Sequence, residues 1–247
     1  MSDFLVKFGS LVKYSIRKIL LKKKVVSAFL GFMFIVAVMG YASTQSVEKL
    51  SEGTQLMNVL ILSFLVPVIS MIYGSTIIRD EMDDRSITHV VTSPMKKTVS
   101  YFGYYLALVV SLNLMLAIIT TGGFLSFFAP LGIGRSAMDI YLSVLSLSFI
   151  ATLIYSALFL MVSLLTSKSI YFGLFYAFIW EGFVGSLPGN IQKIAVSHYI
   201  KSIGSRWMEY APMENATSIG VSVFLVVILI VILLFMGGWF FDRKEFP

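Results

Sequence analysis

The sequence has no cysteine, 2 histidines and few charged residues, which make up only 13% of its 247 positions. The absence of cysteine excludes disulfides, thiolate metal ligands and thiol nucleophiles. The shortage of charge excludes an ordinary soluble domain, in which about 25% of the residues are charged. Apolar residues are abundant instead: 57% of the chain is hydrophobic and the mean hydropathy is +0.88. The composition therefore predicts a membrane protein.

Long apolar runs indicate how this membrane protein is built. A helix of about 20 apolar residues crosses a bilayer core about 30 Å thick. We therefore expect an all-α polytopic membrane protein with six spans, at 25–43, 56–78, 99–121, 140–165, 170–187 and 218–241. Pro67 is expected to kink the second span. The stretch 122–139, which contains glycines and a proline, is expected to be an exposed connection.

Residues 1–24 precede the first span and are basic and amphipathic. In helical projection, one apolar arc is formed by Phe4, Leu5, Phe8, Leu11, Val12, Ile16 and Ile19. This pattern predicts an interfacial helix in the plane of the lipid headgroups, and a basic, partly disordered tail is the alternative. Because the first long apolar run begins only at Val25, we expect the N-terminus to be retained rather than cleaved as a signal peptide.

The distribution of basic residues predicts the orientation. With six spans both termini lie on one side, and 14 of the 19 Lys and Arg residues lie on that side too. The positive-inside rule then predicts a multi-pass protein of the cell membrane, with both termini and the loop 79–97 in the cytoplasm. Since the net charge of +6 follows this topology, we assign it to contacts with membrane lipids and expect no nucleic-acid partner.

The loop 79–97 is the most charged segment of the chain. Arg79 with Asp83, and Glu81 with Arg85, are spaced i, i+4, and acidic residues gather where a helix N-terminus favours negative charge. This predicts a short cytoplasmic helix over 80–91, which the Ser-Pro pair at 93–94 ends. One face of that helix is apolar and consists of Ile87, Val90 and Val91.

Two other interpretations of this loop stay open. It could be a solvated connection between two spans, or its acidic residues could bind a cation together with His89. The residues concerned are Asp80, Glu81, Asp83, Asp84 and His89. Their spacing is not that of a calcium-binding loop, so we expect no metal site.

An ordered series of residues extends across this loop into the third span: Glu81, Ser86-Ile87, Ser93-Pro94, Lys97 and Gly103. The series resembles the connection between spans two and three of ABC-2 type transporter permeases. The family pattern is a glutamate, a Gly-Thr-Leu-like triplet, a small residue before proline, a basic residue and a Gly-Lys pair. This chain has Arg85 where the glycine is usual and Tyr104 where the lysine is usual.

The resemblance implies that the loop is a coupling helix that docks onto a separate cytoplasmic ABC ATPase. The residues implied to make that contact are Glu81, Arg85, Ser86, Ile87, Val90, Val91 and Pro94. The sequence has no G-x-x-x-x-G-K-[ST] motif, so we expect a non-catalytic subunit without a cofactor of its own. ATP and Mg would bind to two ATPase partners, and the permease would pair with a second copy or a homologue, for export. Residues 188–217 would form an extracytoplasmic re-entrant segment.

Two polar residues inside the predicted spans are candidates for a translocation path. Glu181 is expected roughly 16 Å into the membrane, where an ionisable group indicates function. A structural role at the bend into the re-entrant segment is equally open, because Gly182, Gly185 and Pro188 interrupt the helix. Asn113 is the second candidate, although such side chains also form hydrogen bonds within and between helices.

Two functions from other classes remain as alternatives. A membrane-embedded lipid-modifying enzyme needs a catalytic cluster at one membrane face, and only loop 79–97 has acidic residues for it. Those residues lack a repeated D-x-x-D-G arrangement. An ATP-independent carrier or channel would be favoured by internal repeats, and we detect none. The sequence does not specify the substrate.

Overall fold

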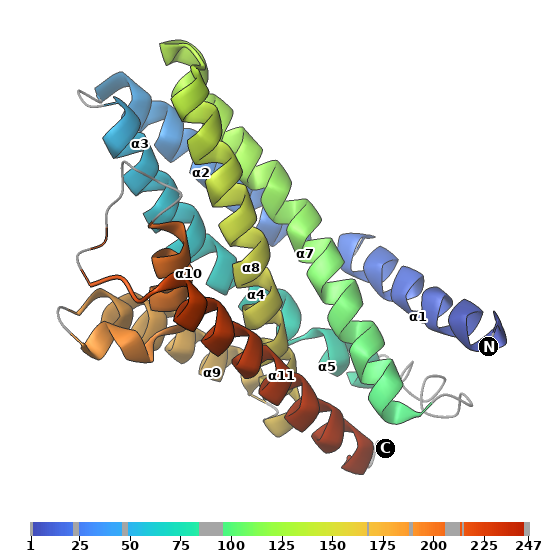
Figure 1. Ribbon diagram of the computed structural model, residues 1–247. Helices are drawn as coiled ribbons and strands as arrows, with labels where there is room; N and C mark the ends of the chain where they lie inside the picture. Colours follow the sequence, from blue (N-terminus) through green and yellow to red (C-terminus); the bar gives the residue numbers. More distant parts are fainter. Residues whose placement is uncertain are drawn as a thin grey trace.

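The computed structural model is a bundle of helices (Figure 1). It describes residues 2–21, 25–45, 49–83, 96–166, 168–187, 190–205, 213 and 215–244. Within these ranges the regular structure is entirely helical, which confirms the all-α fold class for the part of the chain described. Five helical stretches are long and apolar enough to cross a membrane: Val25–Gln45, Leu50–Met82, Lys97–Leu131, Arg135–Leu165 and Ile219–Arg243.

The two ends of the bundle can be told apart in Figure 1. The start of α3 (Lys49–Met57) and the connection from α7 (Lys97–Phe128) to α8 (Arg135–Leu165) lie at one end. The C-terminus, α5 (Ile77–Asp83) and the start of α7 lie at the other. α10 (Val196–Gly204) lies beside α8, part of the way along it.

The second predicted span is irregular close to Pro67. It is built from α3, the π-helix η1 (Asn58–Leu65), α4 (Val66–Gly74) and α5. The backbone N–H of Val66 donates to the carbonyl of Ile61, five residues back, directly before Pro67, which has no N–H to donate. At the predicted kink the structure therefore has a π-helical segment, which ends directly before Val66 and Pro67.

The connection predicted at 122–139 is shorter in the structure. α7 runs on to Phe128, the 3-10 helix η2 (Ala129–Leu131) follows, and α8 already begins at Arg135. Gly122 and Gly123 lie inside α7, where a Cβ on Gly123 would be 2.7 Å from Cγ2 of Ile35 in α2 (Val25–Gln45). These glycines permit close helix packing rather than a turn, so the prediction of an exposed connection there was wrong.

The predicted fifth span, 170–187, is not one regular helix. It consists of α9 (Ser169–Leu174), the π-helix η3 (Phe175–Phe183) and the 3-10 helix η4 (Val184–Ser186). η5 (Ile191–Ile194) and α10 follow it. The described residues thus contain five candidate spans where the sequence predicted six.

The core lies where α7 and α8 pack against their neighbours. α2 and α1 (Ser2–Leu21) cover one side of α7, while α4 and α11 (Ile219–Arg243) pack on α8. Rings fill the contact between α7 and α11: the centroid of Phe241 lies 5.9 Å from that of Tyr101 and 6.3 Å from that of Tyr104. Gly237 lies against the ring of Tyr101, which lets α11 approach α7 closely.

Candidate functional site

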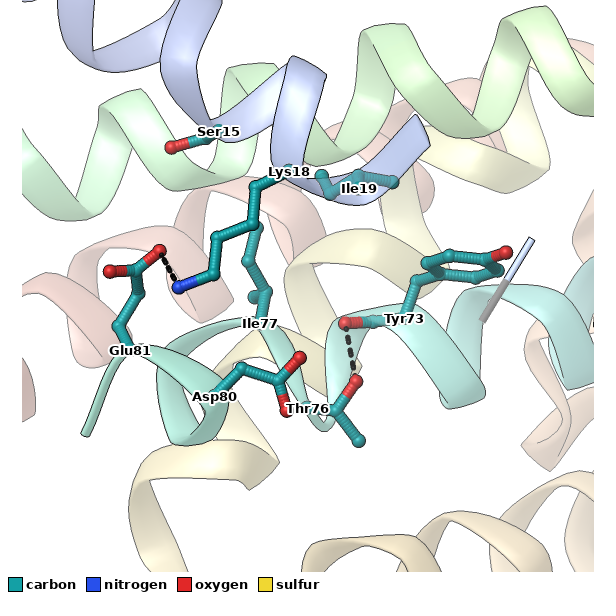
Figure 2. Close-up of a pocket in the computed structure, with 8 residues that line it drawn as sticks. All are labelled: Ser15, Lys18, Ile19, Tyr73, Thr76, Ile77, Asp80 and Glu81. Atoms are coloured by element: carbon teal, nitrogen blue, oxygen red, sulfur yellow. Dashed lines mark hydrogen bonds and ion pairs between the residues drawn. The ribbon is translucent and has the colours of Figure 1, made fainter. Parts of the chain in front are cut away.

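Glu81, the first residue of the predicted coupling set, lies in α5 and is buried. Its side chain is only 2% exposed, and its Oε1 accepts a hydrogen bond from Nζ of Lys18 in α1 at 2.7 Å (Figure 2). A carboxylate removed from water is costly unless it is paired, and Lys18 supplies the opposite charge. The ion pair joins two segments that are 63 residues apart in sequence. Glu81 therefore holds the N-terminal helix instead of facing solvent.

A small cavity lies beside this ion pair (Figure 2). Its volume of about 20 Å³ is enough for one water molecule, far below the roughly 300 Å³ of a small-molecule site. The buried hydroxyl of Ser15 lines it and has no hydrogen-bond partner among the described residues. On the other side, Thr76 donates to the carbonyl of Ile72 at 2.7 Å. The cavity suits a buried water and not a substrate.

The buried stripe of α1 differs from the apolar arc predicted for it. Leu11, Ser15 and Ile19, spaced four residues apart, are buried, and α1 packs on α7. Gly103 of α7 lies under this stripe, because a Cβ at that position would be 2.8 Å from Cδ2 of Leu11. Gly103 is also one of the residues that carries the resemblance to the permease family. Its structural role here is to let α1 approach α7.

Gly103→Leu is expected to push α1 away from α7 and to lower the free energy of unfolding by about 1–3 kcal/mol, the usual cost of overpacking. Thermal unfolding of the purified chain in detergent measures the effect. Gly9→Leu, in the contacting helix α1, is the matched control, because no atom lies within 4 Å of a Cβ there. Equal stability of the two variants would contradict the close contact.

Lysines join the helix ends at the same end of the bundle. Nζ of Lys97, at the start of α7, donates to the carbonyls of Asp242 at 3.4 Å and Lys244 at 3.3 Å, where α11 ends. Nζ of Lys244 in turn donates to the carbonyl of Leu164 at 2.9 Å, in the last turn of α8. Burial, and then the charge of Arg79, lower the pKa of Lys244. α7, α8 and α11 are thereby tied together next to α5.

The rest of the predicted docking surface lies outside the described residues. The predicted helix begins within α5, which ends at Asp83. Outside the described residues lie Arg85, Ser86, Ile87, Val90, Val91 and Pro94. Tyr104, which stands where the family usually has lysine, is described and is fully buried against Phe241. A lysine there would bring a charge into the core.

Glu181 is the second buried carboxylate and lies in η3. Its Oε1 accepts hydrogen bonds from the hydroxyl of Tyr176 at 2.6 Å and the N–H of Val196 at 3.0 Å. Its Oε2 accepts from the N–H of Ser197 at 2.9 Å. Val196 and Ser197 are the first residues of α10, whose N–H groups have no partner within the helix. Glu181 therefore caps α10 from a distant segment, and the negative charge suits the helix N-terminus.

Asn113, the other path candidate, forms a hydrogen bond within its own helix. Its Nδ2 donates to the carbonyl of Val109, four residues back in α7, at 2.9 Å. The side chain is half-buried. This local hydrogen bond is the intrahelical alternative considered for such residues. Neither Asn113 nor Glu181 lines the cavity beside Lys18 and Glu81.

Two further observations bear on function. Within the described ranges, no group of three or more His, Cys, Asp or Glu side chains could hold a metal ion. The sequence matches no known protein family and no curated protein. The functional interpretation therefore rests on the helix bundle, its two buried carboxylates and the residue order noted in the sequence.

Proposed function

We propose that this chain is the permease subunit of an ATP-binding-cassette transporter and works as a pair with a second copy or homologue. Two cytoplasmic ATPase subunits would bind ATP and Mg, and the permease would form an export path. The observation that carries the proposal is the set of contacts made by Glu81, Lys97 and Gly103. These three residues belong to the series that resembles the ABC-2 permeases, and all three fasten helices together at one end of the bundle.

Through these contacts, a movement of residues 84–95 would be transmitted to the membrane helices. A push on that segment reaches α5 on one side and α7 on the other, because it connects them. From α5 it passes through Glu81 to Lys18 and α1, and from α7 through Lys97 to the end of α11. Rigid helices that are joined in this way move as a unit. The two states would differ in the contacts between ATPase and permease, as any ligand-driven shift requires.

The proposal includes the finer topology expected from the sequence. The irregular segment 170–187 would cross the membrane as the fifth of six spans, with both termini in the cytoplasm and 188–217 as the re-entrant segment outside. The π-helical geometry of η3 and the cap that Glu181 provides for α10 support it. Irregular backbone at membrane depth is tolerated where protein covers it and satisfies its hydrogen bonds.

Ile87→Asp is expected to abolish recovery of the partner ATPase while the permease still inserts in the membrane. A charge in the apolar face of a docking helix must be desolvated on binding, which weakens the contact by several kcal/mol. The tagged permease is co-expressed with a Walker-motif ATPase whose gene lies next to its own. The membranes are then solubilised in detergent, and affinity purification measures how much ATPase is recovered with the permease.

The matched control is Ile191→Asp in η5, an exposed isoleucine in a segment outside the proposed docking surface. It should leave the yield of the complex unchanged. Normal recovery of the ATPase with Ile87→Asp would refute the docking role. A parent chain that transports its substrate with no ATPase bound would refute the proposed function itself.

A further inference from the structure

A second cavity has a polar lining and shares no lining residue with the cavity beside the ion pair of Lys18 and Glu81. It has a volume of about 320 Å³, at the lower limit for sites that hold small ligands. Helices η1, α8 and α10 contribute to its wall. Its polar lining consists of Gln55, Asn58, Gln192, Lys201 and Ser205. Among the described residues that line it none is acidic, and their only formal charge is the positive charge of Lys201.

Lys201 lies in α10 and contributes an ammonium group to this lining. Its side chain is half-buried in α10 and forms no ion pair with any described residue. Burial lowers the pKa of Lys201, and Glu181 acts in the opposite direction. The oxygens of Glu181 are already occupied by Tyr176 and by two N–H groups of α10. A partly dehydrated ammonium group thus faces a cavity without a direct partner.

The helix that presents Lys201 is held at both ends. Glu181 caps its first turn, and Ser202 accepts a hydrogen bond from the N–H of Thr217 at 3.1 Å. Nε2 of His198 lies 2.9 Å from the hydroxyl of Thr217. These contacts hold the helix that carries Lys201, so that a ligand would not have to order its backbone.

We propose that this cavity binds a phosphate-type oxyanion, with Lys201 as the charged contact and the carboxamides of Asn58 and Gln192 as neutral donors. An ammonium group and amide N–H₂ groups are donors, and they match the acceptor oxygens of a phosphate. The group can belong to a free phosphate compound or to the headgroup of an anionic phospholipid, because the cavity is bounded by helices of the membrane bundle. The proposal does not depend on the transport function and can be tested on the chain alone.

The test measures binding to the full chain in a neutral detergent. One arm titrates inorganic phosphate, and the other titrates short-chain phosphatidylglycerol against short-chain phosphatidylcholine, all at constant ionic strength. A rise in the unfolding temperature with ligand concentration gives the dissociation constant. Lys201→Met should weaken binding at least tenfold, and Lys201→Arg should retain it. Lys193→Met is the matched control, since Lys193 is exposed nearby and does not line the cavity.

Each outcome decides the question. Binding of phosphate that Lys201→Met weakens supports a free-anion site, and selective binding of phosphatidylglycerol that the same variant weakens supports a headgroup site. Equal binding by Lys201→Met and the parent, or no binding in either arm, overturns the proposal. If Lys201→Met fails to fold, Val59→Trp replaces it, because Val59 is 57% exposed at the wall and a larger side chain there would fill the cavity. Unchanged binding by that variant also overturns the proposal.

Discussion

Glu181→Leu is expected to lower the free energy of unfolding by about 3–5 kcal/mol, because it removes three hydrogen bonds to a charged acceptor. Two backbone N–H groups of α10 and the hydroxyl of Tyr176 would stay in a buried place without a partner. Leucine fills the space but accepts no hydrogen bond. The measurement is thermal or denaturant unfolding of the purified chain in detergent, with intrinsic fluorescence as the signal.

Two comparison variants sharpen this test. Asp139→Asn changes an exposed acidic residue and should shift stability by less than about 0.5 kcal/mol. Tyr176→Phe removes one of the three hydrogen bonds and should cost about 1–2 kcal/mol. If Glu181→Leu is as stable as the parent, the capping role of Glu181 is refuted.

The same residue separates a structural from a transport role. Glu181→Gln keeps the size of the side chain and loses the charge. Under the capping role it should lose stability while each folded molecule transports as well as the parent. Normal stability with lost transport would instead place Glu181 in the translocation path, which was the other reading of the sequence.

Breaking the ion pair between Lys18 and Glu81 is the second change with a large expected effect. Lys18→Met and Glu81→Leu should each cost about 2–3 kcal/mol of unfolding free energy, because each removes one charge of a buried ion pair. The side chains of the pair are 15% and 2% exposed, so water screens the attraction little. The double variant should cost less than the sum of the two single changes, by about 1–3 kcal/mol.

The matched control for this cycle is Lys13→Met, which removes an exposed lysine of the same helix and should be nearly neutral. Stability measured in detergent tests the ion pair itself. The proposed coupling is tested separately, by measuring ATP hydrolysis coupled to transport in the complex of the permease with its ATPase. If the effects of the two single changes on stability are additive, the two charges do not interact. The ion pair would then not stabilise the contact between α1 and α5.

The two lysine contacts at the helix ends had no signal in the sequence. Lys18 is not part of the apolar arc in residues 1–24, and Lys97 is the basic position of the loop pattern. In the structure both reach segments more than sixty residues away. A lysine has several donors on a long flexible stem, so its partner depends on what tertiary packing brings within reach.

The sequence by itself determined the all-α class, which holds in the part of the chain that the structure describes, and the presence of helices able to span a membrane. Hydropathy and length are local properties, and a helix satisfies its backbone hydrogen bonds within its own segment, so the class follows without knowledge of packing. The i, i+4 pattern at the start of loop 79–97 predicts a helix over 80–91, of which the structure describes residues 80–83, within α5. The N-terminal helix was also predicted within a few residues of its observed bounds.

Only the tertiary structure decided which hydrogen bonds and ion pairs the polar groups form, and which glycines lie in turns or in helix contacts. Gly122 and Gly123 indicated a connection by composition, yet Ile35 and Phe32 of α2 make them contact points inside α7. Glu181 had two open roles until α10 placed its N–H groups against the carboxylate. A glycine and a buried carboxylate are each compatible with several environments, and the neighbour that packs against them selects one.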